Sequence, residues 1–402
     1  MNKKNKFFGF GKNVTIAGLV SFFMDLSSEM IYPLVPLFLA NVIGVNKSVI
    51  GLIEGIAEST ASLLKVFSGY LSDRIGNRKW LMAAGYGIST LSRPFIALAT
   101  GWHQVMGSRF IDRFGKGVRT APRDVIIAES TDSAYLGRAF GFHRSMDTLG
   151  AVAGPALAFF LLRALSNDYR KVFWLSMIPG VVAVLLILFF ITEKRKPVTP
   201  HADRPKLTLK HFDWRFRFFV VVAGIFALGN SSDVFLILRA QQIGISATMI
   251  PIVYLVFNLV YSLSAIPAGM AADRFGKKRI IFWGFVLFAA LYWGFARASE
   301  PKTIWVLFGL YGLFMGLTEG IQKAFLTTII PSDFKATAFG VFNTVVGIAT
   351  LPASLIGGWL WDKVSPSATF YFGAITAALS AVLFIGFASF VKQGPKPENI
   401  FE

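Results

Sequence analysis

Long apolar runs alternate with short polar segments along the whole chain of 402 residues. Most of these runs extend over roughly 20 residues or more, the length that a helix needs to cross the ~30 Å hydrocarbon core of a bilayer. The pattern therefore predicts twelve membrane-spanning helices. We expect them at about residues 14–40, 48–70, 80–100, 103–126, 137–163, 171–192, 214–238, 246–271, 280–298, 303–329, 335–361 and 368–391.

A polar segment divides the twelve predicted helices into two sets of six. Residues 193–213 are rich in Lys, Arg, Pro and His and have no apolar periodicity, which is typical of a linker. We therefore expect an N-terminal six-helix bundle in residues 1–192, a cytoplasmic linker in 193–213 and a C-terminal six-helix bundle in 214–402. The predicted fold class is an all-α polytopic membrane protein.

The composition favours the same class. Hydrophobic residues make up 54% of the chain and charged residues only 15%, whereas about a quarter of the residues in a soluble domain are charged. The net charge of +18 would suggest nucleic acid as the partner of a soluble protein. In a membrane protein, basic residues in the cytoplasmic loops account for this charge, so we expect a lipid bilayer and no nucleic acid.

The positions of the basic residues predict the orientation of the helices. With six helices in each half, both termini and the linker fall on one side, and most loop Lys and Arg lie there, which makes that side cytoplasmic. These residues are Lys3, Lys4, Lys6, Lys12, Arg74, Arg78, Lys79, Arg138, Lys194, Arg195, Lys196, Lys206, Arg274, Lys277, Lys278 and Arg279. The first residues indicate a cytoplasmic tail rather than a signal peptide. We expect a multi-pass protein of the cell (inner) membrane.

The two halves carry the same loop motif. Residues 69–79 and 269–279 share the spacing Gly-x-x-x-Asp-Arg-x-Gly-x-basic-basic. A second match relates residues 27–29 to residues 231–233 at a similar offset. Matches at one offset, near 200 positions, predict parallel repeats around an axis along the membrane normal.

This loop motif resembles the signature of the major facilitator superfamily, and the resemblance extends over essentially the whole chain. It implies two six-helix bundles that rock around a central cavity. In that superfamily, the Asp of the loop pairs with basic residues and a helix end and so holds the outward-facing state. The resemblance assigns a conformational latch, with Asp73 as the main candidate, to Gly69, Asp73, Arg74, Gly76, Arg78, Gly269, Asp273, Arg274 and Gly276. The alternative is a charged loop that only fixes topology.

A second motif narrows the resemblance. Gly150, Gly154 and Pro155 resemble the Gly-x-x-x-Gly-Pro motif of the twelve-helix drug:proton antiporter branch, in which a kinked and closely packed helix seals the cavity. The two Gly lie one turn apart and admit a neighbouring helix, while Pro155 bends its own helix. The Gly pair that follows in the branch is Ala158 and Phe159 here. Ordinary small-residue packing without a role in coupling is the alternative.

Charged residues inside the predicted helices indicate the mechanism, because a charge at the bilayer centre is costly unless it faces protein or a wet cavity. A carboxyl group that gains and loses a cationic neighbour can release and bind a proton. The candidates for proton coupling are Asp25, Glu29, Glu54 and Glu58, with Arg113 as their partner. Arg113 and Gly117 also resemble the branch's Arg-x-x-x-Gly motif, whose Arg is associated with proton transfer. For each carboxyl, a fixed ion pair is the alternative.

The sign of these charges indicates the cargo. The predicted helix at 103–126 is rich in Arg and Lys, and Arg binds carboxylate oxygens bidentately. We therefore expect export of an anionic or zwitterionic small organic molecule in exchange for protons. The candidate substrate-binding residues are Tyr32, Arg119, Arg144, Asp147, Asn230, Asp233 and Asn343. Proton- or ion-coupled uptake of a nutrient, export of neutral amphiphiles and a receptor that does not transport are the alternatives.

No other chemistry is indicated by the sequence. It has no Gly-x-x-x-x-Gly-Lys-Ser/Thr loop for phosphates, and no cysteine and four scattered His give no metal-site spacing. A nucleophile elbow is also absent from the sequence. We therefore expect no enzyme activity, no cofactor and no metal. We expect a monomer whose partners are the substrate, protons and the bilayer.

Overall fold

A computed structural model describes residues 11–75, 77–132, 135–193, 213–330 and 335–390. Within these ranges it describes all side chains except those of residues 65–67, 69–75, 335–337 and 388–390. The described residues form helices and turns and no strand, which confirms the all-α prediction.

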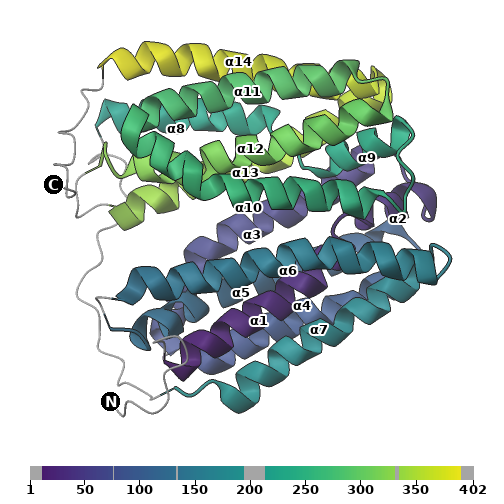
Figure 1. Cartoon of the computed structure of the whole chain (residues 1–402), viewed down its shortest axis with the longest axis vertical. Helices are drawn as coiled ribbons and strands as arrows, with labels where there is room; N and C mark the ends of the chain where they lie inside the picture. The colour runs from purple at the N-terminus through teal and green to yellow at the C-terminus, as the bar shows by residue number, and fades with distance from the viewer. Residues whose placement is uncertain (1–10, 76, 133–134, 194–212, 331–334, 391–402) are drawn as a thin grey trace.

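The helices follow the predicted apolar runs closely (Figure 1). Each predicted span coincides with one helix or with two consecutive helices. Their bounds are α1 Lys12–Ile31, α2 Val35–Asn41, α3 Lys47–Ile75, α4 Arg78–Leu98, α5 Trp102–Glu129, α6 Leu136–Ala164, α7 Tyr169–Phe190, α8 Trp214–Gly229, α9 Val234–Gln242, α10 Ile250–Phe275, α11 Lys277–Arg297, α12 Pro301–Leu326, α13 Lys335–Lys363 and α14 Pro366–Phe390.

Two spans that the apolar pattern predicts as single helices are each divided in two. The first breaks between α1 and α2 at Pro33, which has no N–H to donate to the carbonyl oxygen one turn before it. The second breaks between α8 and α9 at Ser231 and Ser232, because serine hydroxyls compete for nearby backbone groups. The Ser232 hydroxyl accepts a hydrogen bond from the N–H of Val234 at 3.5 Å. Each pair of helices still makes one long apolar segment.

Nine segments of the described chain are long and apolar enough to cross a membrane by length and composition. Among the long helices, α3, α4 and α5 do not meet this measure. These three helices contain buried charged residues, including Glu54, Arg93 and Arg109. Their polar side chains therefore face protein instead of lipid, as the cost of an exposed charge in a bilayer requires.

The helices form two six-helix bundles, with α1/α2 and α8/α9 each counted as one span. In the first bundle α1 packs against α6 and α7, and in the second α10 packs against α12. Glycines of α6 allow its close approach to α1. A Cβ added at Gly154 would lie 2.7 Å from the Cβ of Glu29 and 3.0 Å from the carbonyl oxygen of Leu26. Contacts of α3 with α13 and of α6 with α10 join the bundles.

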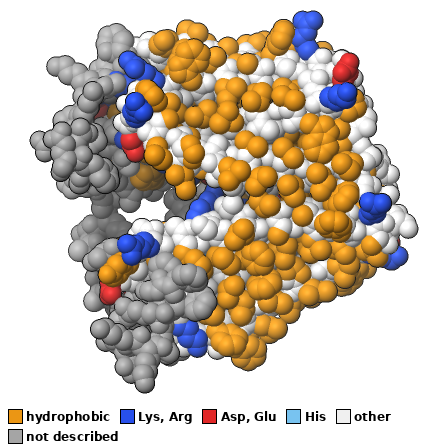
Figure 2. All heavy atoms as spheres, in the orientation of Figure 1, with side chains coloured by type: hydrophobic (Ala, Val, Ile, Leu, Met, Phe, Trp, Pro, Cys, Tyr) orange, Lys and Arg blue, Asp and Glu red, His pale blue; other side chains and the backbone are white. Residues whose placement is uncertain are grey.

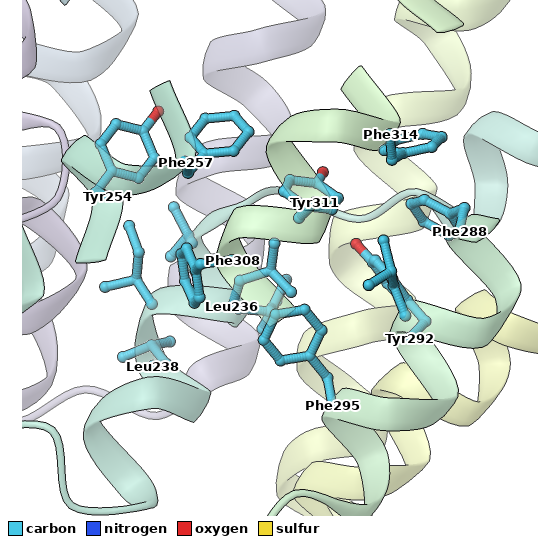
Figure 3. Close-up of a cluster of buried hydrophobic side chains, with 14 of the residues drawn as sticks. Leu236, Leu238, Tyr254, Phe257, Phe288, Tyr292, Phe295, Phe308, Tyr311 and Phe314 are labelled. Carbon is cyan, nitrogen blue, oxygen red and sulfur yellow. The ribbon is translucent and has the colours of Figure 1, made fainter. Parts of the chain in front are cut away.

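Aromatic side chains fill the second bundle. The rings of Phe288 and Tyr292 stack with their centroids 3.9 Å apart, and those of Phe226 and Phe285 lie 4.5 Å apart. Figure 3 shows how this cluster continues through Tyr311 towards the first bundle. Such rings bury a large apolar area and prefer offset or edge contacts. The interior of the second bundle is thus mainly apolar, in contrast to that of the first.

The two bundles meet at one end of the molecule and separate at the other. We call the end at which α1 begins and α7 ends the inner end; there the Asn13 amide donates to the carbonyl oxygen of Thr192 at 2.7 Å. At the opposite, outer end, α2 contacts α9. Figure 2 shows a hollow between the bundles that opens at the inner end and contains a basic side chain. The space between the bundles therefore opens towards the inner end.

Candidate functional site

Charged side chains of α3, α4 and α5 meet inside the first bundle. We call this set the charge layer, and it consists of Glu54, Glu58, Arg93, Arg109, Asp112 and Arg113. Arg109 binds Glu54 through two hydrogen bonds, from Nε to Oε1 at 2.8 Å and from Nη2 to Oε2 at 2.6 Å. Only 3% of Arg109 and 1% of Glu54 are exposed. This pair therefore has the bidentate geometry that makes Arg–carboxylate interactions strong.

Arg93 of α4, like Arg109 and Asp112 of α5, belongs to the charge layer but is not among the site residues predicted from the sequence. Its Nη1 lies 2.9 Å from Asp112 Oδ1, and its Nη2 donates to the Ser28 hydroxyl at 2.9 Å. Asp112 is also 3.8 Å from Arg109 of its own helix, but its hydrogen-bonded partner is on α4. The signal that could have identified Arg93 is a single charge within an apolar run, which marks a buried partner.

The third pair of the charge layer is less buried. Arg113 Nη2 lies 2.8 Å from Glu58 Oε1, and 35% of the Glu58 side chain is exposed. The ring of Tyr32 lies 5.9 Å from the Arg113 guanidinium, which is within the range of a cation–π contact. Because each Arg of the layer has a carboxylate partner, these six residues together carry no net charge.

Two of the four candidate proton-coupling carboxyls lie outside the charge layer, on α1. Asp25 and Glu29 form no salt bridge with any described residue, and Glu29 Oε2 is buried without a hydrogen-bond partner in the described part of the chain. The ammonium group of Lys116 interacts electrostatically with both carboxyls. These two carboxyls therefore differ from Glu54 and Glu58, which have Arg partners.

Asp147 of α6 lies against the same face of α1. Its Oδ1 accepts a hydrogen bond from the Ser21 hydroxyl at 2.9 Å, and its carboxyl is within hydrogen-bonding reach of Asp25. Its other oxygen lies 3.1 Å from Arg144 Nη1. Asp147 thus connects Asp25 of α1 with Arg144, which faces the second bundle.

A polar chain crosses between the bundles from Arg144. Arg144 Nη2 donates to the hydroxyl of Tyr261 on α10 at 2.9 Å, and that hydroxyl donates to Glu319 on α12. Lys323 lies 3.5 Å from the same carboxylate. About 60% of the Arg144 side chain is exposed, so this polar chain of side chains is accessible as well as charged. Tyr261 is a further residue of the site that was not predicted from the sequence.

The remaining candidate substrate-binding residues occupy different surroundings. Asp233 accepts a hydrogen bond from the Tyr311 hydroxyl at 2.7 Å. Asn230 and Asn343 are half-buried on the second bundle. The guanidinium of Arg119 lies 4.3 Å from the Tyr86 ring and is 95% buried, with its Nη1 unpartnered among the described residues. The structure brings Tyr32 and Asp147 near the charged groups of the first bundle, whereas Arg119 lies deeper inside it.

The latch motif is described more fully in its second copy. Gly276 has a φ of +95°, which favours glycine, and it joins α10 to α11. Asp273 is exposed and lies 3.8 Å from Lys277. In the first copy, Gly76 lies outside the described residues. Only the helical backbone of Gly69, Asp73 and Arg74 is described. Arg78 pairs with Glu129 at 2.7 Å.

A family comparison identifies this architecture. The model of the Major Facilitator Superfamily matches the chain twice, over residues 17–238 and over residues 218–400. The chain belongs to the Major Facilitator Superfamily. The two matches, one for each half, agree with the repeated loop motif.

Similar proteins include transporters of this superfamily. An uncharacterized MFS-type transporter of Methanocaldococcus jannaschii is 36% identical over 380 residues, which are 93% of this chain and 94% of the relative. The proton-coupled antiporter flippase LtaA of Staphylococcus saprophyticus is 23% identical over 396 residues, covering 93% and 94%. The multidrug resistance protein MdtL of Escherichia coli is 24% identical over 313 residues, covering 76% of each.

Solved structures of the superfamily share the fold. The nucleoside transporter NupG has a TM-score of 0.75 at 14% identity, covering 95% of this chain and all of that one. A POT family transporter in complex with 5-aminolevulinic acid has a TM-score of 0.82 at 12% identity, covering 97% and 99%. As a Major Facilitator Superfamily member, the protein is a multi-pass membrane transporter of small molecules and not an enzyme.

Proposed function

We propose that the protein is a secondary active transporter that exports a small organic molecule in exchange for protons. The observation that carries this proposal is the position of Asp25 and Glu29, two carboxyls in the first bundle without a salt bridge to a described residue. A carboxyl in such a place can hold a proton in one state and release it in another, when a cation or water approaches. The relative named a proton-coupled antiporter supports this assignment.

The four candidate carboxyls then take different roles. Asp25 and Glu29 bind the transported proton. Glu58, which is partly exposed and paired with Arg113, exchanges its partner when the cavity changes shape. Glu54, in its buried fork with Arg109, holds α3 against α5.

Transport proceeds by alternating access. The hollow at the inner end corresponds to one state, and rocking of the bundles opens the outer end in the other. Because the loops at the inner end are rich in Lys and Arg, this end is cytoplasmic, both termini lie there, and the membrane is the cell (inner) membrane. The motif around Asp73, with its copy at Asp273, holds the inner end closed in the outward-facing state.

The cargo is zwitterionic or anionic, and the charge pairing favours a zwitterion. Arg144 lies beside Asp147, and Lys323 lies beside Glu319, so the accessible polar chain offers both signs of charge. A zwitterion satisfies both, because its carboxylate binds the guanidinium and its cationic group binds a carboxylate. An anion would depend on Arg119 and Lys116, the α5 cations that lie outside salt bridges with described residues.

Export of neutral amphiphiles is a second candidate, which one observation favours. The second bundle presents aromatic rings towards the first, and Tyr32 and Tyr254 meet with centroids 5.4 Å apart. Aromatic surfaces bind amphiphiles without charge, and a relative is named a multidrug resistance protein.

The test uses purified protein in proteoliposomes with an imposed pH gradient. A panel of anionic, zwitterionic, neutral and permanently cationic compounds is compared for the wild type, Arg113→Gln and Arg119→Gln. We expect zwitterions to move against the direction of proton flow, with slower transport in Arg113→Gln. Transport of permanent cations that neither substitution affects would contradict the proposed zwitterionic or anionic cargo. Movement of the cargo in the same direction as protons would contradict exchange and indicate proton-coupled uptake.

A further inference from the structure

The outer end is closed by a carboxylate that one bundle places on a helix of the other. Asp362, in the last turn of α13, accepts hydrogen bonds from the N–H groups of Lys47 and Ser48 at 3.1 and 2.7 Å. It also accepts one from the Ser48 hydroxyl at 2.6 Å. Lys47 and Ser48 begin α3, where N–H groups have no partner within their own helix. A negative charge at this position is also favoured by the helix dipole.

A second contact at the outer end repeats this arrangement with the bundles exchanged. The Thr248 hydroxyl, just before α10, donates to the Asn167 amide oxygen, just after α6, at 2.7 Å. Thr248 and Ser48 are 200 positions apart (248 − 48), the same offset as the loop motif. Both follow a glycine with positive φ, Gly44 at 76° and Gly244 at 103°. The two hydroxyl donors are therefore equivalent residues of the two halves.

The acceptors lie at corresponding ends of corresponding helices, although Asp362 and Asn167 are 195 positions apart (362 − 167) and are not equivalent residues of the repeat. Asp362 ends α13 and Asn167 follows the end of α6, and these are the helices that join the bundles through α3 and α10. Packing around Asp362 is close, since a Cβ added at Gly358 would lie 2.5 Å from the carbonyl oxygen of Lys47. Opening of the outer end separates these helices, so both hydrogen-bonded contacts have to break.

We propose that Ser48 with Asp362, and Thr248 with Asn167, form a paired outer latch that stabilises the state with a closed outer end. The inference rests on the alternating access of the proposed function, but not on its cargo or its coupling ion. The two contacts are unequal. Asp362 brings a charge and three hydrogen bonds, whereas Asn167 accepts one bond as a neutral amide. Asp362 therefore dominates the latch.

The test measures the separation of the bundles at the outer end by pulsed electron paramagnetic resonance. The chain has no cysteine, so spin labels on His103→Cys and Ser299→Cys, two exposed positions on different bundles, report a single distance. In Asp362→Ala we expect the ratio of outer-open to outer-closed molecules to rise about tenfold, since three hydrogen bonds to a charged group are lost. In Thr248→Val we expect a rise of about threefold, since one neutral bond is lost.

Glu193→Ala is the matched control. Glu193 accepts hydrogen bonds from the N–H groups of Arg78 and Lys79 at 3.0 and 2.8 Å, which is the same chemistry at a helix start, but within one bundle. We expect its outer distances to equal those of the wild type. Monodisperse elution establishes that each variant is folded, and Ser48→Ala, which removes a single hydroxyl, replaces Asp362→Ala if the latter is not.

Two results would overturn the proposal. One is an unchanged distance distribution in folded Asp362→Ala or its replacement, and the other is an equal shift in Glu193→Ala. The result of this test does not depend on whether the proposed function is correct. Distances that shift as expected in a protein that shows no proton-driven flux would support the outer latch and reject the proton-coupled export.

Discussion

Arg109 and Glu54 face each other as two forks, with both guanidinium-to-carboxylate distances below 3 Å and almost no exposed surface. Burial removes water from both ions, and the pair compensates for this loss only while both partners are present. Removing one partner leaves the other charge buried. The pair is therefore expected to act on the stability of the first bundle.

Glu54→Gln is predicted to lower the free energy of unfolding by about 3–5 kcal/mol, because the Arg109 charge stays buried without its partner. Denaturant unfolding in detergent measures the change. The double variant Glu54→Leu with Arg109→Met, which removes both charges, should recover most of the loss. A Glu54→Gln protein of wild-type stability that has lost proton coupling would instead make Glu54 a proton carrier.

Asp25→Asn is predicted to abolish transport driven by a pH gradient while it preserves exchange of labelled cargo without a gradient. The reason is that an amide cannot take up and release the proton, whereas its shape still fits between α1 and α6. Paired assays in proteoliposomes measure both activities. Asp132→Asn, at an exposed loop position, serves as the control. Gradient-driven transport by Asp25→Asn at the wild-type rate would shift the role to Glu29.

Asp73→Asn is predicted to reduce transport strongly while expression and stability stay near those of the wild type. The substitution removes the charge of the motif and leaves the packing of its helix unchanged. Crosslinking between cysteines at the inner helix ends should fall in the variant. Asp273→Asn, in the second copy, is expected to have the weaker effect. Transport at the wild-type rate would leave Asp73 as a residue that only fixes topology.

Gly154→Ala is predicted to destabilise the protein by about 1–3 kcal/mol, because its new methyl group would collide with Glu29 and the backbone of α1. The same substitution at Gly141 of α6, where nothing lies within 4 Å of the added Cβ, should stabilise by about 0.5–1 kcal/mol. Thermal unfolding of the two variants measures the difference. Equal stability of the two would show that the α1–α6 contact is loose.

Much of the fold could be predicted from the sequence because membrane helices depend on long apolar runs. The repeat at 69–79 and 269–279 also identified the duplicated architecture. The breaks at Pro33 and Ser231 escaped prediction because the runs continue through them. Apolar composition records which segments enter the bilayer, and it does not record where a helix bends within it.

The site was predictable in its residue types and only partly in its pairing, since Arg113 pairs with Glu58 but not with the other three candidate proton-coupling carboxyls among the described salt bridges. The sequence placed Asp25, Glu54 and Arg113 inside helices, which is enough to infer a buried polar interior. Which carboxyl has an Arg partner depends on the relative rotation and depth of α1, α3 and α5, and no pattern within one helix contains that information. Arg93 shows the consequence, because its carboxylate partner lies on another helix.

The charge layer also has a consequence for the biogenesis of the protein. A helix that leaves the translocon alone must be soluble in lipid, and α3, α4 and α5 are not among the described segments that are long and apolar enough to cross a membrane by length and composition. Among the described residues, the charges of the charge layer pair with one another across these three helices. These three helices are therefore expected to wait at the translocon and enter the bilayer as a group, once α5 has been synthesised. A nascent chain that ends after α4 would hold Arg93 without Asp112 and would be a substrate for membrane quality-control proteases.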